Sequence, residues 1–158
     1  MIIVIGAGPA GLAAAEAASR NGTDVALIDS APRKGGQYWR HRKTVQGYRS
    51  NRADRLFAKI ESALSITHIS EATVWSIEKE GDLFRVNYLQ GGEESSLTAE
   101  KLILATGAYD RSLPFPGWDK PGSMTPGAAQ AMLKGSGVLV GKRVVVAGTG
   151  PFLLPVAT

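Results

Sequence analysis

Three glycines in a G-x-G-x-x-G pattern and one later acid have the types and spacing of a dinucleotide site: Gly6, Gly8, Gly11 and Asp29. The first glycine permits a tight turn, the second leaves the backbone open to a diphosphate, and the third lets a helix pack closely on a strand. Asp29 lies 18 residues after Gly11, close to the ~20 at which an acid takes the ribose hydroxyls of a dinucleotide. The pattern therefore predicts a site for a diphosphate and its ribose, although a glycine turn that serves only backbone geometry would share the spacing.

The elements that must position these residues are a strand, a helix and a second strand. The apolar runs Ile2–Ile5 and Val25–Ile28 suit buried parallel strands. We expect a helix over residues 9–20, because proline suits a first helical turn and Asn21-Gly22 supplies a left-handed stop. The N–H groups at the start of this helix would then face the phosphates. The residues expected on its inner face are Ala10, Ala13, Ala14 and Ala17.

The middle of the chain changes from helical to strand periodicity. Residues 72–77, 83–89 and 96–98 have the composition of short strands, and the turn sequences Glu80-Gly81-Asp82 and Gly91-Gly92 separate them. Short runs joined by tight glycine turns predict an antiparallel β-meander. A simple Rossmann unit would have another helix at this place, so the meander is an insertion.

Two further elements flank the meander. Residues 52–64 suit an amphipathic helix, with Leu56, Ile60 and Leu64 along one apolar stripe. After the meander, the continuous apolar run 101–105 suits a central parallel strand. The chain therefore returns to the parallel sheet once the meander is complete.

The C-terminal part of the chain repeats the opening design. Prolines and glycines punctuate residues 114–122 as a linker, and a short helix is expected over 128–134. Residues 143–150 then combine an apolar strand with a second G-x-G turn. We therefore predict a dinucleotide-binding domain over 1–117, followed over 118–158 by a linker and the first strand, turn and helix of a second, incomplete nucleotide-binding domain.

The composition is that of a globular protein without membrane spans or disulfides. Of the 158 residues, 44% are hydrophobic and 20% are charged, and no apolar run reaches the ~20 residues of a membrane span. The absence of cysteine excludes a dithiol redox pair and a thiolate metal site, so no metal site is predicted, and it fits a cytoplasmic location. The aromatic residues do not alternate with basic ones, so no nucleic-acid partner is expected. The basic cluster 40–43 is interpreted as a solvated loop or as a surface for an anionic cofactor or another protein chain.

The motifs, taken in order, resemble those of the two-dinucleotide flavoprotein family, the pyridine nucleotide-disulfide oxidoreductase superfamily in its broad sense. The segments that carry the resemblance are 4–11, Asp29, 35–37, 104–107, 114–117 and the strand at Val144. The resemblance implies an α/β fold: a Rossmann-like FAD-binding domain with a parallel sheet, helices and a meander, truncated at the start of a second Rossmann module. Segments 35–40 and 148–155 are similar to a narrower group. It consists of the large flavoprotein subunits of opine oxidase, proline or hydroxyproline dehydrogenase, sarcosine oxidase and hydrogen cyanide synthase.

The resemblance also implies which residues bind FAD. The turn 6–11 would lie at the pyrophosphate and residues 29–30 at the adenosine ribose. Residues 36–37 would line the side between pyrophosphate and flavin. Val74 would offer its backbone to the adenine, and residues 105–107 would pass close to the cofactor. The implied cofactor-binding residues are Gly6, Gly8, Pro9, Ala10, Gly11, Asp29, Ser30, Gly36, Gln37, Val74, Ala105, Thr106 and Gly107.

Two departures from the family pattern limit what the resemblance implies. No C-x-x-C pair is present, so disulfide reduction is excluded. In the second glycine motif Leu153 stands where a small residue normally closes the helix on the strand, and Pro155 follows. Both features argue against an ordinary NAD(P) site there. No catalytic residue is identified, since His41 and His68 are interpreted as structural or solvated, and residues 109–111 are candidates only for contact with substrate.

We therefore expect the N-terminal FAD-binding portion of a flavin-dependent oxidoreductase, similar to the amine and imino-acid dehydrogenase subunits. Its flavin would accept a hydride from a small amine or imino-acid substrate. The alternative is a catalytically silent nucleotide-binding or assembly fragment that lacks a complete active site. A dehydrogenase that uses NAD alone would leave the meander unexplained. Because the incomplete second module would leave apolar residues uncovered, we expect a homo-oligomer or a hetero-subunit partner.

Overall fold

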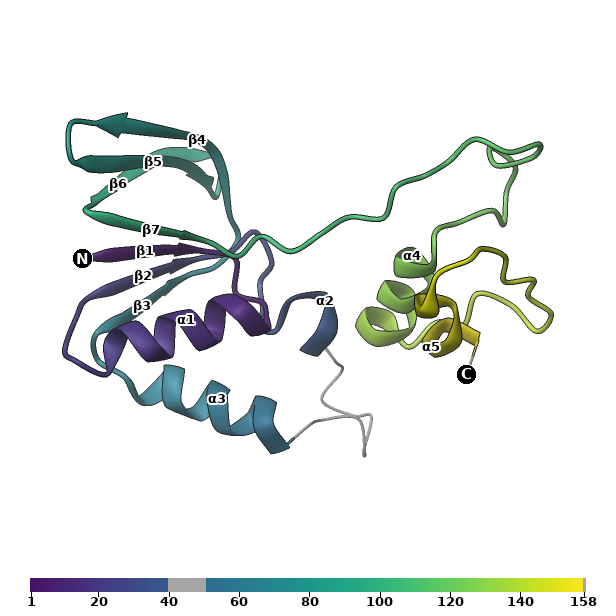
Figure 1. The fold of residues 1–158 in the computed structure, drawn as a ribbon, viewed down its shortest axis with the longest axis horizontal. Coiled ribbons are helices and arrows are strands. Elements are labelled where there is room, and N and C mark those ends of the chain that lie inside the picture. The colour runs from purple at the N-terminus through teal and green to yellow at the C-terminus, as the bar shows by residue number, and fades with distance from the viewer. Residues whose placement is uncertain (40–50, 158) are drawn as a thin grey trace. The chain divides into compact units, whose positions relative to one another are not determined.

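The computed structural model describes residues 1–39 and 51–157 (Figure 1). These residues divide into two compact units, one that ends at Gly107 and one that begins at Ala108. The basic cluster 40–43 lies outside the described residues. The division into domains at residue 117 stays a prediction, and the two units are described separately below.

The first unit is organised around a four-stranded parallel sheet of order β3-β2-β1-β7. Its strands are β1 (Ile2–Ile5), β2 (Val25–Ile28), β3 (Ile66–Ile69) and β7 (Lys101–Leu104). The predictions for β1 and β2 are confirmed, and both are almost wholly buried, as their continuous apolar runs require. The short strand β3 was not predicted.

The position of β7 differs from the prediction. It pairs in parallel with β1, but among the described strands it has no second neighbour, so it lies at an edge of the sheet rather than in its centre. Accordingly, Leu104 is 63% exposed. An apolar run shows that a strand can be buried, whereas its place in the sheet depends on which other strands pair with it.

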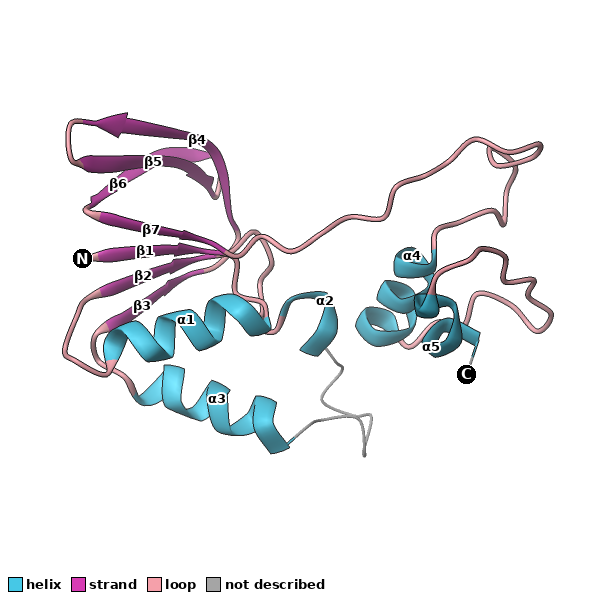
Figure 2. Ribbon diagram, viewed as in Figure 1, coloured by secondary structure: helices cyan, strands magenta, loops and turns pink. Residues whose placement is uncertain are grey.

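Helices α1 (Pro9–Ser19) and α3 (Asn51–Ser62) cover one face of the sheet, and the short α2 (Gly36–Trp39) lies beyond the start of α1 (Figure 2). The apolar cluster beneath them joins sheet residues to the inner sides of α1 and α3, and includes Val4, Leu12, Leu27, Phe57 and Ile60. Both long helices begin and end within two residues of their predicted bounds. Their inner faces agree with the predicted ones only in part.

On α1 the buried residues are Gly11, Leu12 and Ala15, whereas Ala10, Ala13 and Ala17 are exposed. Of the predicted alanine face only Ala14 packs against the core, because alanines occur on both sides of this helix and cannot mark the buried one. On α3 the buried residues are Ala53, Phe57 and Ile60, and Leu56 packs against the same cluster, so the prediction is confirmed for Leu56 and Ile60. Leu64 follows the end of that helix and is fully exposed, so it does not continue the stripe.

The antiparallel meander forms as predicted, and it covers the opposite face of the sheet. Its strands are β4 (Ala72–Glu80), β5 (Leu83–Gln90) and β6 (Glu93–Ala99), paired antiparallel in that order. Val86 and Tyr88 of β5 pack on Ile3 and Ile28 of the parallel sheet in a second apolar cluster. Side chains of alternate residues in β1 thus point into two different cores, one under the helices and one under the meander.

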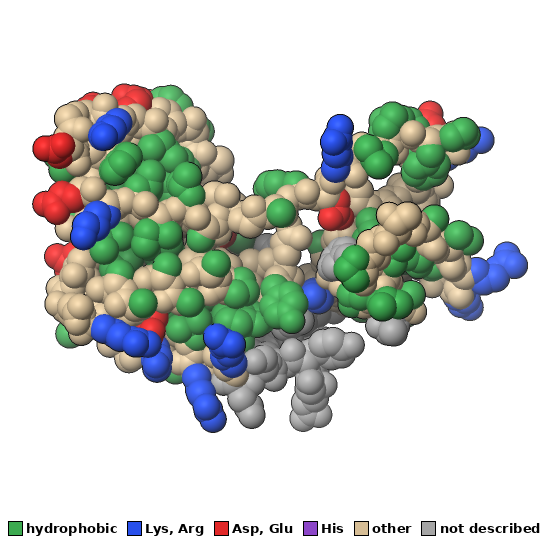
Figure 3. Space-filling model, in the orientation of Figure 1, with side chains coloured by type: hydrophobic (Ala, Val, Ile, Leu, Met, Phe, Trp, Pro, Cys, Tyr) green, Lys and Arg blue, Asp and Glu red, His purple; other side chains and the backbone are tan. Residues whose placement is uncertain are grey.

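The second unit contains α4 (Pro126–Ala131), a π-helical turn η1 (Met132–Ser136), a 3-10 turn η2 (Pro151–Leu153) and α5 (Leu154–Ala157). The helix expected over 128–134 corresponds to α4 and η1. The strand expected from residue 143 does not form, because a strand requires a pairing partner and the described residues 108–157 contain no other strand. No side chain described in this unit is buried, and apolar ones are exposed at its surface (Figure 3), among them Leu139, Val145 and Leu154.

Among the described helices, none combines the length and the apolar composition that a bilayer-spanning helix requires.

Candidate functional site

Two of the three motif glycines are required by the protein's own packing. Gly6 follows β1 with a φ of +103°, and a Cβ there would overlap the carbonyl group of Ala105 at the end of β7. A Cβ on Gly11 would overlap the carbonyl oxygen of Gly6 and lie 3.3 Å from the Cβ of Ala105. Both glycines therefore allow α1, β1 and β7 to approach one another, which is a structural role.

Gly8 is different, because neither its backbone nor its neighbours require glycine. Its φ of −74° and ψ of −178° are accessible to any residue. The nearest atom to an added Cβ is the Cα of Gly36, at 4.0 Å. Gly8 is the N-cap of α1 and offers no side-chain cap to the first N–H groups of that helix. The missing side chain thus leaves space beside a helix N-terminus, where an anion is stabilised by free N–H groups and the helix dipole.

A second glycine pair packs against this turn. The N–H of Gly35 donates to the carbonyl oxygen of Ala7 at 2.8 Å. Gly36 has a φ of +57°, and a Cβ there would lie only 2.9 Å from the Cα of Gly8. The two glycine loops, 6–8 and 35–36, therefore lie backbone to backbone at the start of α1.

The carboxylate of Asp29 is held in place at the end of β2. Its Oδ2 accepts a hydrogen bond from the N–H of Ala7, and its Oδ1 accepts one from the N–H of Ala31 at 2.7 Å. The main chain of Asp29 is fixed as well, because its N–H donates to the carbonyl of Ile69 and its carbonyl accepts from the N–H of Ala72. Asp29 is half-buried. Since each carboxylate oxygen can accept two hydrogen bonds, both retain capacity for ribose hydroxyls.

The other predicted site residues differ in how closely they are connected to the glycine turn. Pro9 and Ala10 form the first turn of α1, and the N–H of Ala105 donates to the carbonyl of Ile5 at 2.8 Å. The Cα of Thr106 would lie 3.2 Å from a Cβ on Gly6. Within the described part of the chain, no backbone hydrogen bond joins the glycine turn to Ser30, Gln37, Val74, Thr106 or Gly107. Of these, Val74 pairs with Tyr88 in the meander and is half-buried, whereas the remaining four are exposed.

Two charged residues, Lys34 and Asp29, act on the side chain of His68. The Nζ of Lys34 forms an ion pair with the Oε1 of Glu61 on α3, at 3.0 Å. His68 on β3 is half-buried, and its Nε2 is buried without a hydrogen-bond partner among the described residues. Burial lowers the pKa of His68 below its ordinary value, the charge of Lys34 lowers it further, and Asp29 opposes the shift. The interpretation of His68 as a structural residue agrees with these surroundings.

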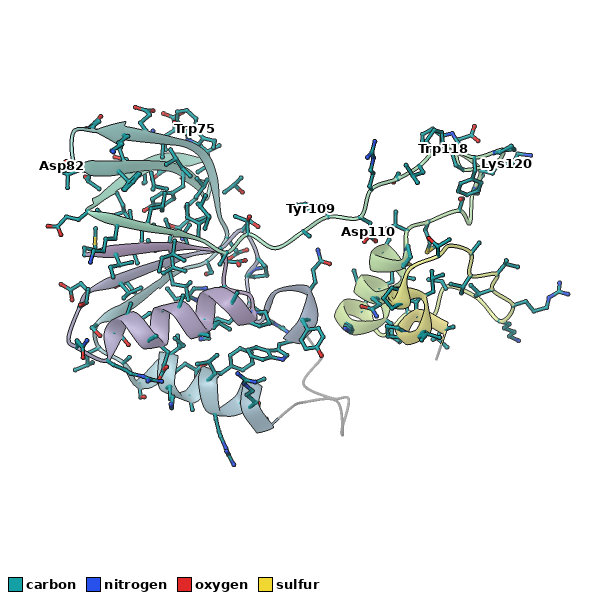
Figure 4. All side chains as sticks on the ribbon, in the orientation of Figure 1. Trp75, Asp82, Tyr109, Asp110, Trp118 and Lys120 are labelled. Carbon is teal, nitrogen blue, oxygen red and sulfur yellow. The ribbon has the colours of Figure 1, made fainter. Side chains whose placement is uncertain are left out.

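Asp110 makes a structural contact within the second unit. Its Oδ2 accepts a hydrogen bond from the N–H of Gly127 at 2.6 Å, and the side chain points toward the start of α4 (Figure 4). The Oγ1 of Thr125 accepts from the N–H of Ala128 at the same helix start. Two free N–H groups of α4 are thereby satisfied. The neighbouring Tyr109 is exposed.

Within the described ranges 1–39 and 51–157, no group of three or more metal-ligating side chains occurs.

Comparisons with known proteins agree with this geometry. The family model of the pyridine nucleotide-disulphide oxidoreductases matches residues 1–157. An opine oxidase subunit from Agrobacterium tumefaciens is 40% identical over 169 aligned residues, which cover 99% of this chain and 33% of that protein. The HcnB subunit of hydrogen cyanide synthase from Pseudomonas protegens is 36% identical over 98% of this chain and 34% of its own length. The chain thus spans about a third of the length of these relatives.

Among solved structures, the L-proline dehydrogenase from P. horikoshii is similar with a TM-score of 0.74 and 25% sequence identity. The similarity covers 89% of this chain and 29% of that one. The architecture described above is therefore shared with a much longer protein.

Proposed function

Because this chain belongs to the pyridine nucleotide-disulphide oxidoreductase family, we propose that it is the FAD-binding portion of a flavin-dependent oxidoreductase. The observation that carries the proposal is the space at Gly8. Nothing in the backbone or in the protein packing requires glycine there, since the nearest atom to an added Cβ is 4.0 Å away. A diphosphate close to the main chain supplies the missing reason for glycine at this position.

The residues present fit the diphosphate and ribose of a dinucleotide. The first N–H groups of α1 face the space at Gly8, and α1, with 11 residues, is long enough to carry a helix dipole. The N–H of Ala7 is bonded to Asp29, so the glycine turn and the ribose-binding acid form one assembly. The second glycine pair, Gly35 and Gly36, would lie on the side of the diphosphate that leads to the flavin.

In this proposal the chain's own residues bind and orient the cofactor. The N–H groups of α1 would donate to the diphosphate, and Asp29 would accept hydrogen bonds from ribose hydroxyls. When bound, the flavin would supply the hydride-accepting chemistry of the family. No described side chain is assigned to proton transfer.

We propose an amine or imino acid as the substrate class of the whole enzyme. The proposal is supported by the names of the similar proteins, which include an L-proline dehydrogenase and one component of an opine oxidase. Two of the similar proteins are named as subunits, which supports a hetero-subunit partner over a solitary chain. A homo-oligomer is the alternative arrangement.

The second glycine motif is not proposed as an NAD(P) site. Leu153 occupies the position that corresponds to Gly11, and a Cβ on Gly148 would lie 3.2 Å from the Cδ1 of Leu153. At Gly11 even a single Cβ would overlap the preceding turn. A leucine therefore prevents the same close approach of helix to strand, and FAD at the first motif is the only cofactor proposed.

The second candidate function is a nucleotide-binding or assembly module without chemistry of its own. It is favoured by the second unit, in which no described side chain is buried. Visible flavin absorbance of the purified chain, followed during addition of L-proline and of an opine, distinguishes the candidates. Bleaching by substrate supports the oxidoreductase, and colour without bleaching supports the binding module. A chain that neither carries nor takes up FAD contradicts both.

A further inference from the structure

Trp39, the last residue of α2, attaches the second glycine loop to α3. Its ring lies edge-on to that of Phe57, with ring centroids 6.1 Å apart and planes at 89°. This is a preferred geometry for two aromatic side chains. Trp39 is half-buried and packs against the apolar cluster that lies between the sheet and the two long helices. The aromatic pair thus connects a four-residue helix to the core of the first unit.

Contacts continue from Trp39 to the second glycine loop. The N–H of Trp39 donates to the carbonyl oxygen of Gly35 at 2.9 Å. Gly35 has a φ of +116°, and a Cβ there would lie 3.0 Å from the carbonyl carbon of Trp39 and 3.1 Å from its Cβ. The main chain of Trp39 is therefore folded tightly over Gly35, and a shift of the indole displaces this loop.

The second glycine loop is in turn fastened to the first. The N–H of Gly35 donates to the carbonyl oxygen of Ala7 at 2.8 Å, and a Cβ on Gly36 would lie 2.9 Å from the Cα of Gly8. Position 36 must therefore be glycine for this approach, whereas position 8 need not be. The position of α2 thus determines how much room remains beside Gly8.

A helix as short as α2 cannot hold this position by itself. Its length is four residues, and none of them is buried. Isolated helices need many more residues to be stable in water, so tertiary contacts must supply its stability. Gln37 and Tyr38 are both exposed, which leaves Trp39 as the residue of α2 that reaches the apolar core.

We propose that Trp39 is a positioning residue of the diphosphate site: its edge-on contact with Phe57 holds Gly36 at a fixed distance from Gly8. The identity of the ligand rests on the proposed function, whereas the link between the aromatic pair and the glycine loops rests on the contacts alone. Trp39 does not itself line the space at Gly8. Its effect on a ligand passes through Gly35 and Gly36.

The binding test compares Trp39→Leu and Trp39→Phe with a matched control, Trp75→Leu, which alters a tryptophan that is 56% exposed on β4. Titration with FAD and with adenosine separates the diphosphate from the nucleoside. Since loss of an aromatic pair can shift an equilibrium by about 3- to 10-fold, Trp39→Leu should weaken FAD binding by up to that factor and leave adenosine binding unchanged. Trp39→Phe should restore most of the FAD affinity, and Trp75→Leu should match the wild type. Equal losses of affinity for FAD and adenosine, or no loss for FAD, would overturn the proposal.

A ligand-free measurement keeps this inference distinct from the proposed function. Amide exchange at Gly35 should become faster in Trp39→Leu, because the bond to Ala7 loses its support, while amides of β1 stay as protected as in the wild type. Phe57→Leu removes the same pair from the side of α3 and should produce the same change at Gly35. Unchanged exchange at Gly35 in both variants would contradict the inference. If the wild type takes up no FAD, the function proposal fails and the exchange data still decide the role of Trp39.

Discussion

At the scale of single residues, the three motif glycines have different reasons to be glycine. Gly6 and Gly11 are required by close contacts with the chain itself, at Ala105 and at the turn, so they would be needed without any ligand. Gly8 has an ordinary backbone conformation and no close neighbour. The G-x-G-x-x-G pattern here therefore combines two structural positions with one that points to a ligand, and the contacts of each glycine agree with the roles expected from the spacing.

Substitution at Gly8 should affect binding more than stability. In Gly8→Val the nearest protein atom to the added Cβ is 4.0 Å away, but the side chain occupies the space proposed for the diphosphate. Because Gly8 is the N-cap of α1 and valine is a poorer N-cap than glycine, a small loss of stability accompanies the change. We expect FAD affinity to fall by about 10- to 100-fold, the factor that corresponds to a typical overpacking cost. Titration with FAD and thermal unfolding measure the two effects.

A matched control for this substitution is Gly135→Val, since no atom lies within 4 Å of a Cβ there and its φ is not left-handed. FAD affinity should be the same in this variant as in the wild type. Undiminished FAD binding by Gly8→Val would refute the assignment of the site.

His68 should make the stability of the first unit depend on pH. Its pKa is lowered in the folded state, first by burial and then by Lys34, against an ordinary value of 6.5. Between the lowered pKa and 6.5 the unfolded chain binds the proton more readily than the folded one. Stability is therefore fully present above pH 6.5 and is lost as the pH falls below it.

The variant His68→Phe removes this titration. Its free energy of unfolding, measured by urea denaturation from pH 8 to pH 5, should decline less steeply than that of the wild type. At pH 8 both proteins have an uncharged residue 68, so their pH dependence should agree there. Identical slopes below pH 6.5 would show that His68 is not the group responsible.

At the scale of the elements, the start of α1 is the point where the sheet, the helix layer and both glycine loops meet. The turn after β1 is held by Ala105 of the segment after β7, by Asp29 after β2 and by Gly35 before α2. Three segments distant in sequence thus fix one turn. This convergence lies at the carboxyl ends of parallel strands, where ligands bind in open α/β sheets.

The packing of α1 on this turn provides an element-scale prediction. In Gly11→Val, the added side chain would overlap the carbonyl oxygen of Gly6 and push the helix away from β1. The free energy of unfolding should fall by ~1–3 kcal/mol through overpacking. Ala13→Val is the control, because Ala13 lies on the exposed side of the same helix and tests only the lower helix propensity of valine. Equal stabilities of the two variants would contradict the packing role of Gly11.

At the scale of the whole molecule, the two units differ in how much core they contain. The first unit has one apolar cluster on each face of its sheet. The second has no buried side chain among its described residues, and Val145 there is 94% exposed. The chain also spans only about a third of its relatives' length. Exposed apolar surface of this kind favours association with further protein.

This difference predicts two levels of protection from amide exchange in the isolated chain. Amides of β1 and β2, which are paired and buried, should exchange only through cooperative unfolding of the first unit. Residues 139–150, which form no helix or strand, should exchange at nearly the rate of an unstructured peptide. Mass spectrometry of exchanged peptides measures both. Protection of residues 139–150 equal to that of β1 would contradict this prediction.

The sequence alone was sufficient for features that local composition determines. Apolar runs, a proline and Asn21-Gly22 located β1, α1 and β2, and glycine turns located the meander, because such signals act over a few residues. The spacing of the glycines and Asp29 indicated the site for the same reason. Ordered motifs along the whole chain indicated the family, which the family match over residues 1–157 then confirmed.

Only the tertiary structure decided the features that depend on pairing between distant segments. Three such features are the edge position of β7, the existence of β3 and the buried face of the alanine-rich α1. Each follows from which elements pack together. The local composition would be the same if β7 were a central strand or if the other face of α1 were buried. The close approach of Gly36 to Gly8 and the anchoring of α2 by Trp39 and Phe57 are of the same kind. The strand expected from residue 143 is a prediction that failed for the same reason. Its sequence suits a strand, but residues 108–157 offer it no strand with which to pair.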